Sequence, residues 1–264
     1  MDIKILTPIS HLFLDKNSAE DIIANSDFLE ARERTAQLDF KSTTHYHIDF
    51  DLNIGLTEKQ IEFLEIYVKP RENIRTLTFQ ASRDCEKTII KEGVYYPDSK
   101  ILSLKDQIEN TKNSIVKIEN IIGTERLIGI ENNNFYPSGA YEICTSTEYL
   151  ESIINLNNCH LLFDIAHAIV TCSNKSIPFM KYSKKLLSTE KCFQMHLCQP
   201  SYLFEYGKII AKDAHNIPSF ELTELSISLC KKYGIDFLTI EYYKKAENLV
   251  SYLKFLKDYI LNYE

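Results

Sequence analysis

The sequence predicts a single-domain (β/α)8 barrel that spans residues 1–264. Three observations predict this fold. Strand-like and helix-like segments alternate along the chain, acidic and histidine residues end several of the apolar runs, and the chain has 264 residues. Alternating strands and helices build a parallel sheet, and a closed barrel of this kind takes about 250 residues. No linker, low-complexity tract or internal repeat divides the sequence.

The expected strands are short runs that are apolar or that alternate between apolar and polar residues. In chain order they are residues 3–6, 45–52, 74–81 and 127–131, a strand within 160–170, residues 192–197, a strand within 203–211, and residues 237–241. The segment 203–211 is ambiguous, and it is the candidate for the seventh strand.

Between these runs, apolar residues recur at helical spacing. The expected helices are residues 19–33, 57–68, 102–122, 147–156, 179–187, 221–232 and 247–263. Ser18 and Thr57 are the expected N-caps, because a hydroxyl group can accept a hydrogen bond from a backbone N–H group of the first turn. Gly234 is expected to end helix 221–232, and the apolar stripe of helix 247–263 is expected to pack on the barrel.

The composition favours a cytoplasmic globular protein. The formal net charge of −7 argues against a general nucleic-acid binder, whose binding face is usually basic. No apolar run approaches the length of about 20 residues that spans a membrane, and the N-terminal residues lack the pattern of a signal peptide. The seven cysteines form no CxxC pair, which is typical of reduced thiols in the cytosol.

Candidate functional residues stand at the ends of the apolar runs. Asp164 lies in the run 161–168, where an unpaired carboxylate would be costly to bury, and His167 follows three positions later. Glu131, His196 and Glu241 end comparable runs. Each of these residues alone also fits a plainer interpretation, such as a loop acid or a structural histidine. In a parallel barrel, however, the ends of all strands meet at one face, so these side chains are expected to converge there.

Two pairs of residues at alternate positions add to this set. Asp213 and His215 are separated by one residue, so in an extended segment both side chains face the same way and can bind one ion. His45 and His47 have the same spacing, and one of them is expected to line the site while the other lies at the surface. Carboxylates mixed with imidazoles suit iron, manganese or zinc. Because the set exceeds the need of one ion, two or three ions are expected, with Glu131 or Asp164 as a bridge.

The order of these residues resembles the metal-binding pattern of the xylose-isomerase-like barrel superfamily, which includes endonuclease IV. The surrounding sequence resembles one branch of it, the multinuclear non-haem iron-dependent oxidative enzymes. The resemblance extends from about residue 47 to 256 and rests on the segments 131–136 (ENNNFY), 162–168 (LFDIAHA), 195–197 (MHL), 213–218 (DAHNIP) and 240–243 (IEYY), together with Asn174.

This resemblance implies an oxidoreductase that uses Fe(II) and Fe(III), two or three ions in all, with zinc or manganese as alternatives. It implies dioxygen-dependent modification of a cysteine, asparagine or aspartate in a ribosomally made precursor peptide, which a partner protein presents. The implied catalytic residues are Glu131, Asp164, His196 and Glu241. The implied metal ligands are His47, Glu131, Asp164, His167, His196, Asp213, His215 and Glu241. Gln80, Asn132, Asn174 and Tyr242 are implied as residues that support the ligands or contact the substrate.

The sequence departs from this branch at two positions. Gln80 stands where the branch usually has a histidine ligand at the end of the third expected strand, which puts the number of ions in doubt. His167 stands where many members have asparagine, and this change moves the pattern towards endonuclease IV. The alternatives are therefore phosphodiester hydrolysis of the endonuclease IV type, isomerisation or epimerisation of a sugar, and a scaffold that has lost activity.

Overall fold

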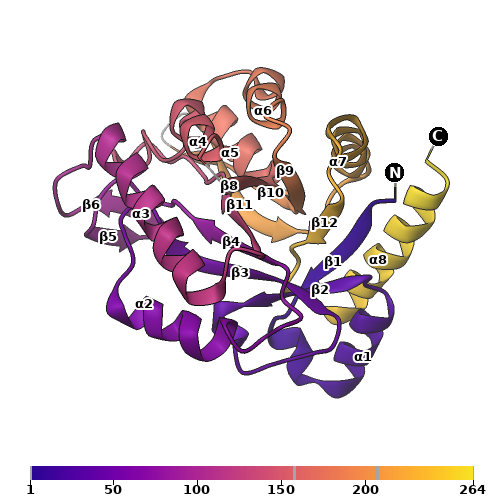
Figure 1. The fold of residues 1–264 in the computed structure, drawn as a ribbon. Coiled ribbons are helices and arrows are strands. Elements are labelled where there is room, and N and C mark those ends of the chain that lie inside the picture. Colours follow the sequence, from indigo (N-terminus) through magenta and orange to yellow (C-terminus); the bar gives the residue numbers. More distant parts are fainter. Residues whose placement is uncertain (1, 157–158, 206–207, 264) are drawn as a thin grey trace.

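The barrel predicted from the sequence is present. A computed structural model describes residues 2–156, 159–205 and 208–263, and it contains a closed barrel of parallel strands in the order β1-β12-β9-β8-β7-β4-β3-β2 (Figure 1). The strands are β1 (Lys4–Pro8), β2 (Phe28–Arg32), β3 (Thr43–Asp51), β4 (Thr76–Gln80), β7 (Leu127–Glu131), β8 (Cys159–Asp164), β9 (Cys192–Leu197) and β12 (Phe237–Ile240). Each pairs in parallel with both of its neighbours.

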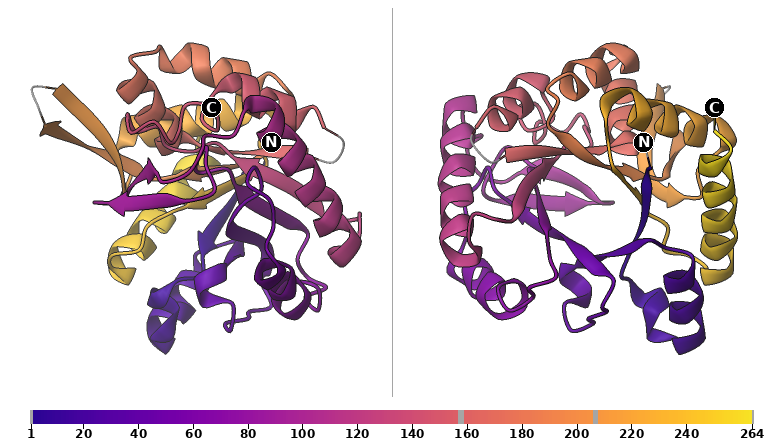
Figure 2. Two further views of the ribbon diagram at one scale, coloured as in Figure 1. Left: turned by 90° about the vertical axis from the view of Figure 1, so that its left-hand side faces the viewer. Right: turned by 45° about the vertical axis from the view of Figure 1, so that its right-hand side comes forward.

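Helices surround the barrel on its outer face (Figure 2). They are α1 (Lys16–Ala24), α2 (Glu58–Phe63), α3 (Leu104–Ile122), α4 (Thr147–Ile154), α5 (Ile165–Lys175), α6 (Phe179–Leu187), α7 (Phe220–Tyr233) and α8 (Ala246–Leu261), with the π-helical turn η3 (Leu64–Val68) after α2 and the short turns η1 (His11–Leu14) and η2 (Glu33–Thr35). Thr57 caps α2 and Gly234 ends α7, as predicted. Among the described residues, none of the helices combines the length and the apolar character needed to cross a membrane.

The predicted helix 19–33 is wrong in its second half. Helix α1 ends at Ala24, and residues 28–32 form the barrel strand β2 between β1 and β3. Ser18 is not the N-cap either, because Asp15 takes that position and accepts the hydrogen bond from the Ser18 backbone N–H. Pairing with two neighbouring strands outweighs the local helical spacing of this short segment.

The predicted seventh strand is also wrong. Its residues belong to a hairpin of β10 (Gln199–Glu205) and β11 (Lys208–Asn216), which extends away from the barrel (Figure 2, left). Asp213 and His215 therefore lie on a hairpin strand rather than at the end of a barrel strand. Asn174 ties the hairpin to α5, since its side chain donates to the Ala211 carbonyl group and accepts from the Ala211 N–H. A smaller hairpin of β5 (Thr88–Lys91) and β6 (Val94–Pro97) was not predicted.

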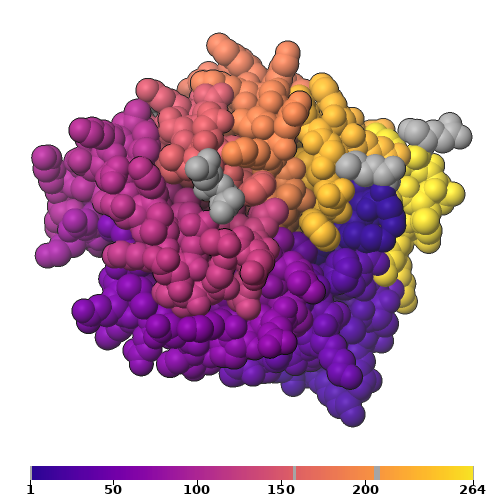
Figure 3. All heavy atoms as spheres, in the orientation of Figure 1, coloured from indigo at the N-terminus to yellow at the C-terminus, as the bar shows by residue number. Residues whose placement is uncertain are grey.

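Apolar side chains fill the space between the strands and the helices. Buried residues from every barrel strand and from the helices form one continuous core. The last helix, α8, packs against α1 beside the N-terminal segment, so the two ends of the chain close the barrel together (Figure 3). The predicted packing of the apolar stripe of α8 is confirmed, because Leu249, Leu253 and Leu256 are buried.

Gly129 in β7 is expected to be required for the packing of the core. A β-carbon at this position would lie 2.9 Å from the Phe193 ring and 3.2 Å from the Thr78 methyl group. Gly129→Ala is therefore expected to destabilise the protein by about 1–3 kcal/mol, the usual cost of overpacking. Chemical denaturation measures this change, and Phe193→Leu in the same chain should recover part of it. An unchanged midpoint in Gly129→Ala would contradict the close packing.

Candidate metal centre

Three of the predicted residues meet at the carboxyl-terminal end of the barrel. Glu131 ends β7, His196 lies near the end of β9, and Glu241 directly follows β12. The Nδ1 atom of His196 lies 3.0 Å from Glu131 Oε1 and 3.3 Å from Glu241 Oε1. All three side chains are buried. Two carboxylate oxygens thus lie close to one imidazole nitrogen, and together the three atoms could hold an ion.

The hairpin and helix α5 complete a ring of donors with Glu131 and Glu241. His215 Nε2 lies 3.5 Å from Glu241 Oε2 and 3.3 Å from Asp213 Oδ2. His167 Nε2 lies 3.6 Å from Asp213 Oδ2, and His167 Nδ1 lies 3.8 Å from Glu131 Oε1. The residues of this ring therefore come from β7, β9, β11 and α5 and from the position directly after β12. His215 adopts a positive φ of 43°, an uncommon conformation for a residue other than glycine.

The surroundings of Asp164 show whether these residues fit a cation. Its Oδ1 atom caps α5 by accepting a hydrogen bond from His167 N, whereas its Oδ2 atom is buried without a hydrogen-bond partner among the described residues. Burial raises the pKa of Asp164 to about 7; the positive charge of His167 opposes this rise, and the charges of Glu241, Glu131 and Asp213 add to it. A buried carboxylate oxygen that accepts no hydrogen bond and lies among three other carboxylates is costly, even with His167 Nε2 at 3.7 Å. A bound cation would remove that cost, so the residues fit a metal.

Asn132 holds the Asp164 side of the site in place. Its side-chain amide donates to the Asp164 carbonyl group and accepts from the Asp164 N–H, at 2.9 and 2.8 Å. The backbone carbonyl oxygen of Asn132 lies 2.9 Å from His167 Nδ1. A proton on Nδ1 would be donated to that oxygen, which leaves the Nε2 lone pair of His167 directed towards Asp164 and Asp213. Such a partner for the second ring nitrogen is typical of histidine metal ligands.

Glu30 and Arg32 belong to the site and were not predicted. Glu30 Oε2 lies 3.0 Å from His196 Nε2, and Arg32 forms ion pairs with both Glu30 and Glu241. Burial raises the pKa of Glu30, but the positive charges of Arg32 and His196 lower it further, to well below its usual range. Tyr243 donates to Glu241 Oε1 at 3.1 Å. Like Asp164, Glu30 is an acid with apolar neighbours in the sequence. It was missed because residues 19–33 were predicted to form a helix.

Glu30→Gln is expected to weaken metal binding about 10–100-fold, which is the usual effect of removing the partner of a ligating histidine. The amide cannot hold His196 with a full negative charge, so the orientation of the Nδ1 lone pair is less strongly fixed. Chelator competition measures the affinity. Glu20→Gln is the matched control, because Glu20 is exposed on α1. Equal affinities in the two variants would contradict a role for Glu30.

The remaining predicted residues fall into two groups. His47 and Gln80 line the site, with His47 Nε2 at 3.5 Å from Glu131 Oε2. His45 is not at the surface as expected but is buried, with its ring 4.5 Å from that of Phe237. Asn174 and Tyr242 lie outside the cavity lining that the described residues form; Asn174 supports the hairpin, and Tyr242 accepts a hydrogen bond from Asn248 of α8.

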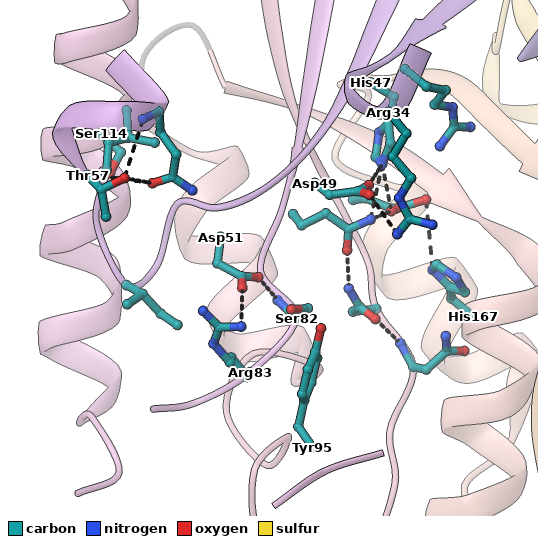
Figure 4. A pocket seen from close by; sticks show the side chains of 18 of the residues that line it. Arg34, His47, Asp49, Asp51, Thr57, Ser82, Arg83, Tyr95, Ser114 and His167 are labelled. Atoms are coloured by element: carbon teal, nitrogen blue, oxygen red, sulfur yellow. Dashed lines mark hydrogen bonds and ion pairs between the residues drawn. The ribbon is translucent and has the colours of Figure 1, made fainter. Parts of the chain in front are cut away.

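The donors line one end of a cavity of about 1290 Å³. Figure 4 shows His47, Asp49 and His167 on one side of this space, and Asp51, Arg83 and Tyr95 on the other. Arg83 pairs with Asp51 at 3.4 Å and lies over the Tyr95 ring. The cavity therefore continues from the donor ring into a polar extension.

No family model and no curated protein matches the chain in sequence. Solved structures match it along nearly its whole length. A 3-keto-D-glucoside 4-epimerase from E. coli has a TM-score of 0.63 at 12% identity, over 97% of this chain and 100% of that one. Endonuclease IV from Thermus thermophilus has a TM-score of 0.60 at 10% identity, over 98% of this chain and 99% of that one. A xylose isomerase-like TIM barrel protein from Mycobacterium smegmatis, in complex with magnesium, has a TM-score of 0.57 at 11% identity, over 98% of both chains.

The fold is a xylose-isomerase-like TIM barrel. At these identities the likeness shows the fold alone, because such barrels support many chemistries. Within this xylose-isomerase-like barrel, the described residues include groups that could hold a metal ion, among them Glu131 with Asp164 and His167, and Glu30 with His196 and Glu241. No family model identifies the iron-dependent oxidative branch.

Proposed function

We propose that the chain is a metal-dependent enzyme that binds two ions and isomerises or epimerises a sugar or a similar hydroxycarbonyl compound. One observation carries this proposal: Glu131 and Glu241 both lie close to His196 Nδ1, at 3.0 and 3.3 Å. This arrangement brings two carboxylates to one end of the cavity, where both could contact a substrate that is bound beside the ions.

The two carboxylates would transfer the proton. Burial raises the pKa of Glu241, but His196 and Arg32 lower it to well below its usual range. Burial likewise raises the pKa of Glu131, and the neighbouring imidazoles lower it below its usual value. Both groups are thus ionised, which is the protonation state that a general base requires. An ion held by these residues would polarise the substrate oxygens.

The position to which the proton returns decides the product. Return to the neighbouring carbon moves the carbonyl group and gives an isomer, whereas return to the same carbon from the opposite side gives an epimer. The epimerase among the structural neighbours supports this chemistry. Among the described residues, no barrel strand ends in the lysine that some sugar isomerases use, and the carboxylates are the proposed bases.

Deuterium exchange tests the proposal. The protein, loaded with Mn²⁺, Mg²⁺, Co²⁺ or Fe²⁺, is incubated with a panel of aldoses and ketoses in D₂O, and NMR follows the carbon-bound hydrogen. Deuterium is expected at the carbon next to the carbonyl group of at least one substrate, and Glu20→Gln should retain it. If no substrate exchanges with any metal, the proposal is wrong.

A second candidate function is the iron-dependent oxidation of a peptide by dioxygen, and three observations favour it. Asp213 and His215 provide more donors than one ion needs. The cavity of about 1290 Å³ also exceeds the range of about 300–1,000 Å³ that is usual for small-molecule pockets. Tyr202, Phe204 and Ile209 on the nearby hairpin are exposed and would suit contact with a precursor peptide or with the protein that presents it. Iron at these donors would supply the redox chemistry, with dioxygen as the oxidant.

Anaerobic purification separates the two candidates. Oxidation predicts more than one iron per chain, together with dioxygen uptake and a mass change when peptides that contain cysteine, asparagine or aspartate are added. Sugar exchange without dioxygen uptake would favour the first candidate. Zinc alone, with cleavage of abasic DNA, would overturn both in favour of phosphodiester hydrolysis.

A further inference from the structure

Gln80 lies between two of the predicted metal ligands. Its Nε2 atom is 2.7 Å from Glu131 Oε2 and 3.0 Å from His47 Nε2. A side-chain amide has two N–H donors on this nitrogen, which matches the two acceptors. The amide thus stands where a cation would contact both residues.

The orientation of the Gln80 amide follows from its neighbours. The backbone N–H of Asn134 donates to Asn133 Oδ1 at 2.7 Å, which fixes the Asn133 side chain with its NH₂ group towards Gln80. Asn133 Nδ2 then donates to Gln80 Oε1. With its oxygen occupied in this way, Gln80 has to direct its NH₂ group, and not a ligating oxygen, towards Glu131. The backbone therefore determines the orientation through two successive amides.

His47 is neutral in this arrangement. Its Nδ1 atom lies 2.9 Å from Thr78 Oγ1, and its Nε2 atom faces the Gln80 NH₂ group. Since Nε2 has to accept from Gln80, the ring proton is on Nδ1 and is shared with Thr78. The lone pair that would bind a metal is engaged by Gln80.

We infer that the Gln80 amide replaces an additional ion between His47 and Glu131, so that the chain binds two ions and not three. The inference rests on the two-ion centre of the proposed function. Gln80 is then a positioning residue, which holds the Glu131 carboxylate for the centre with a neutral group. Asp49 lies at the same point, with Oδ1 at 3.6 Å from His47 Nε2 (Figure 4), so three donors are in place should the amide be exchanged for a ligand.

Exchanging the amide for a ligand tests the inference. Gln80→His adds an imidazole to His47, Asp49 and Glu131, and Gln80→Leu removes the amide without adding a donor. Iron or manganese per folded chain is measured by mass spectrometry after loading and desalting, and circular dichroism verifies the fold. We expect two ions in the wild type, two or fewer in Gln80→Leu, and three in Gln80→His. Gln80→Glu, with a carboxylate in place of the amide, should also gain an ion.

The ¹⁵N shifts of His47 provide a readout that a merely structural role would not change. The wild type should show a proton on Nδ1 and an accepting Nε2 in both metal-free and metal-loaded protein, whereas metal-loaded Gln80→His should show a metal-bound Nε2. Three ions in the wild type, or two in both folded ligand variants, would overturn the inference and leave the sugar chemistry untouched. One ion or none in every variant would overturn the two-ion centre itself.

Discussion

Glu131→Gln is expected to lower kcat about 10³-fold, within the range of 10²–10⁴ that is usual for the loss of a general base. Glu131 lies within 4 Å of three imidazoles, those of His47, His167 and His196. It therefore joins the donors of the barrel strands to those of α5. The amide retains the shape of the side chain but neither takes up a proton nor neutralises an ion.

The rate of deuterium exchange and the metal content have to be measured on the same preparation. A large loss of rate with the metal retained would identify Glu131 as the base, whereas loss of both would identify it as an essential ligand. Glu241→Gln is the informative comparison, because Glu241 also lies close to His196 Nδ1 and is held by Arg32. Full activity in Glu131→Gln would contradict its place in the site under either interpretation.

The sequence predicted most of the site but placed part of it incorrectly. An acid that ends or interrupts an apolar run is a local signal, and it identified Glu131, Asp164 and Glu241 because burying a carboxylate is costly wherever it occurs. The same signal was present at Glu30. It was not used because residues 19–33 fit helical spacing, and only pairing with β1 and β3 makes residues 28–32 a strand.

Asp213 and His215 show a second limit of prediction from sequence. Their alternate spacing correctly indicated an extended segment, but spacing does not distinguish a barrel strand from a hairpin strand. The distinction depends on the antiparallel pairing of β11 with β10, and Asn174 fixes β11 at Ala211. After β12, by contrast, the alternate spacing identifies the correct tyrosine. Tyr243, and not the predicted Tyr242, contacts Glu241, as the spacing of residues i and i+2 that face the same way would suggest.

Removal of the metal is expected to lower Tm by roughly 8–16 °C. A ligand at 1,000 times its Kd contributes about 4 kcal/mol of stability, and in a chain of this size 1 kcal/mol corresponds to about 2–4 °C. The physical reason is the group of carboxylates around Asp164, which repel one another when no cation is present. Thermal unfolding with and without a chelator measures the shift.

Asp164→Asn is the variant that isolates this repulsion. The pKa of Asp164 is about 7 in the folded protein and about 3.9 in an unfolded chain. Between these values the folded state binds a proton that the unfolded state has released. The metal-free wild type should therefore lose stability relative to Asp164→Asn as the pH rises from about 4 to 7, by at most about 1.4 kcal/mol for each pH unit.

Adding the metal should make the wild type more stable to unfolding than Asp164→Asn. An ion requires the ionised carboxylate, so its contribution to the wild type grows as the pH rises, whereas Asp164→Asn gains little at any pH. Denaturant titrations at pH 4.5, 5.5 and 7, each with and without metal, measure the difference in free energy of unfolding. A difference that does not change with pH in the metal-free proteins would contradict the raised pKa. An equal gain from metal in both proteins would remove Asp164 from the ligands.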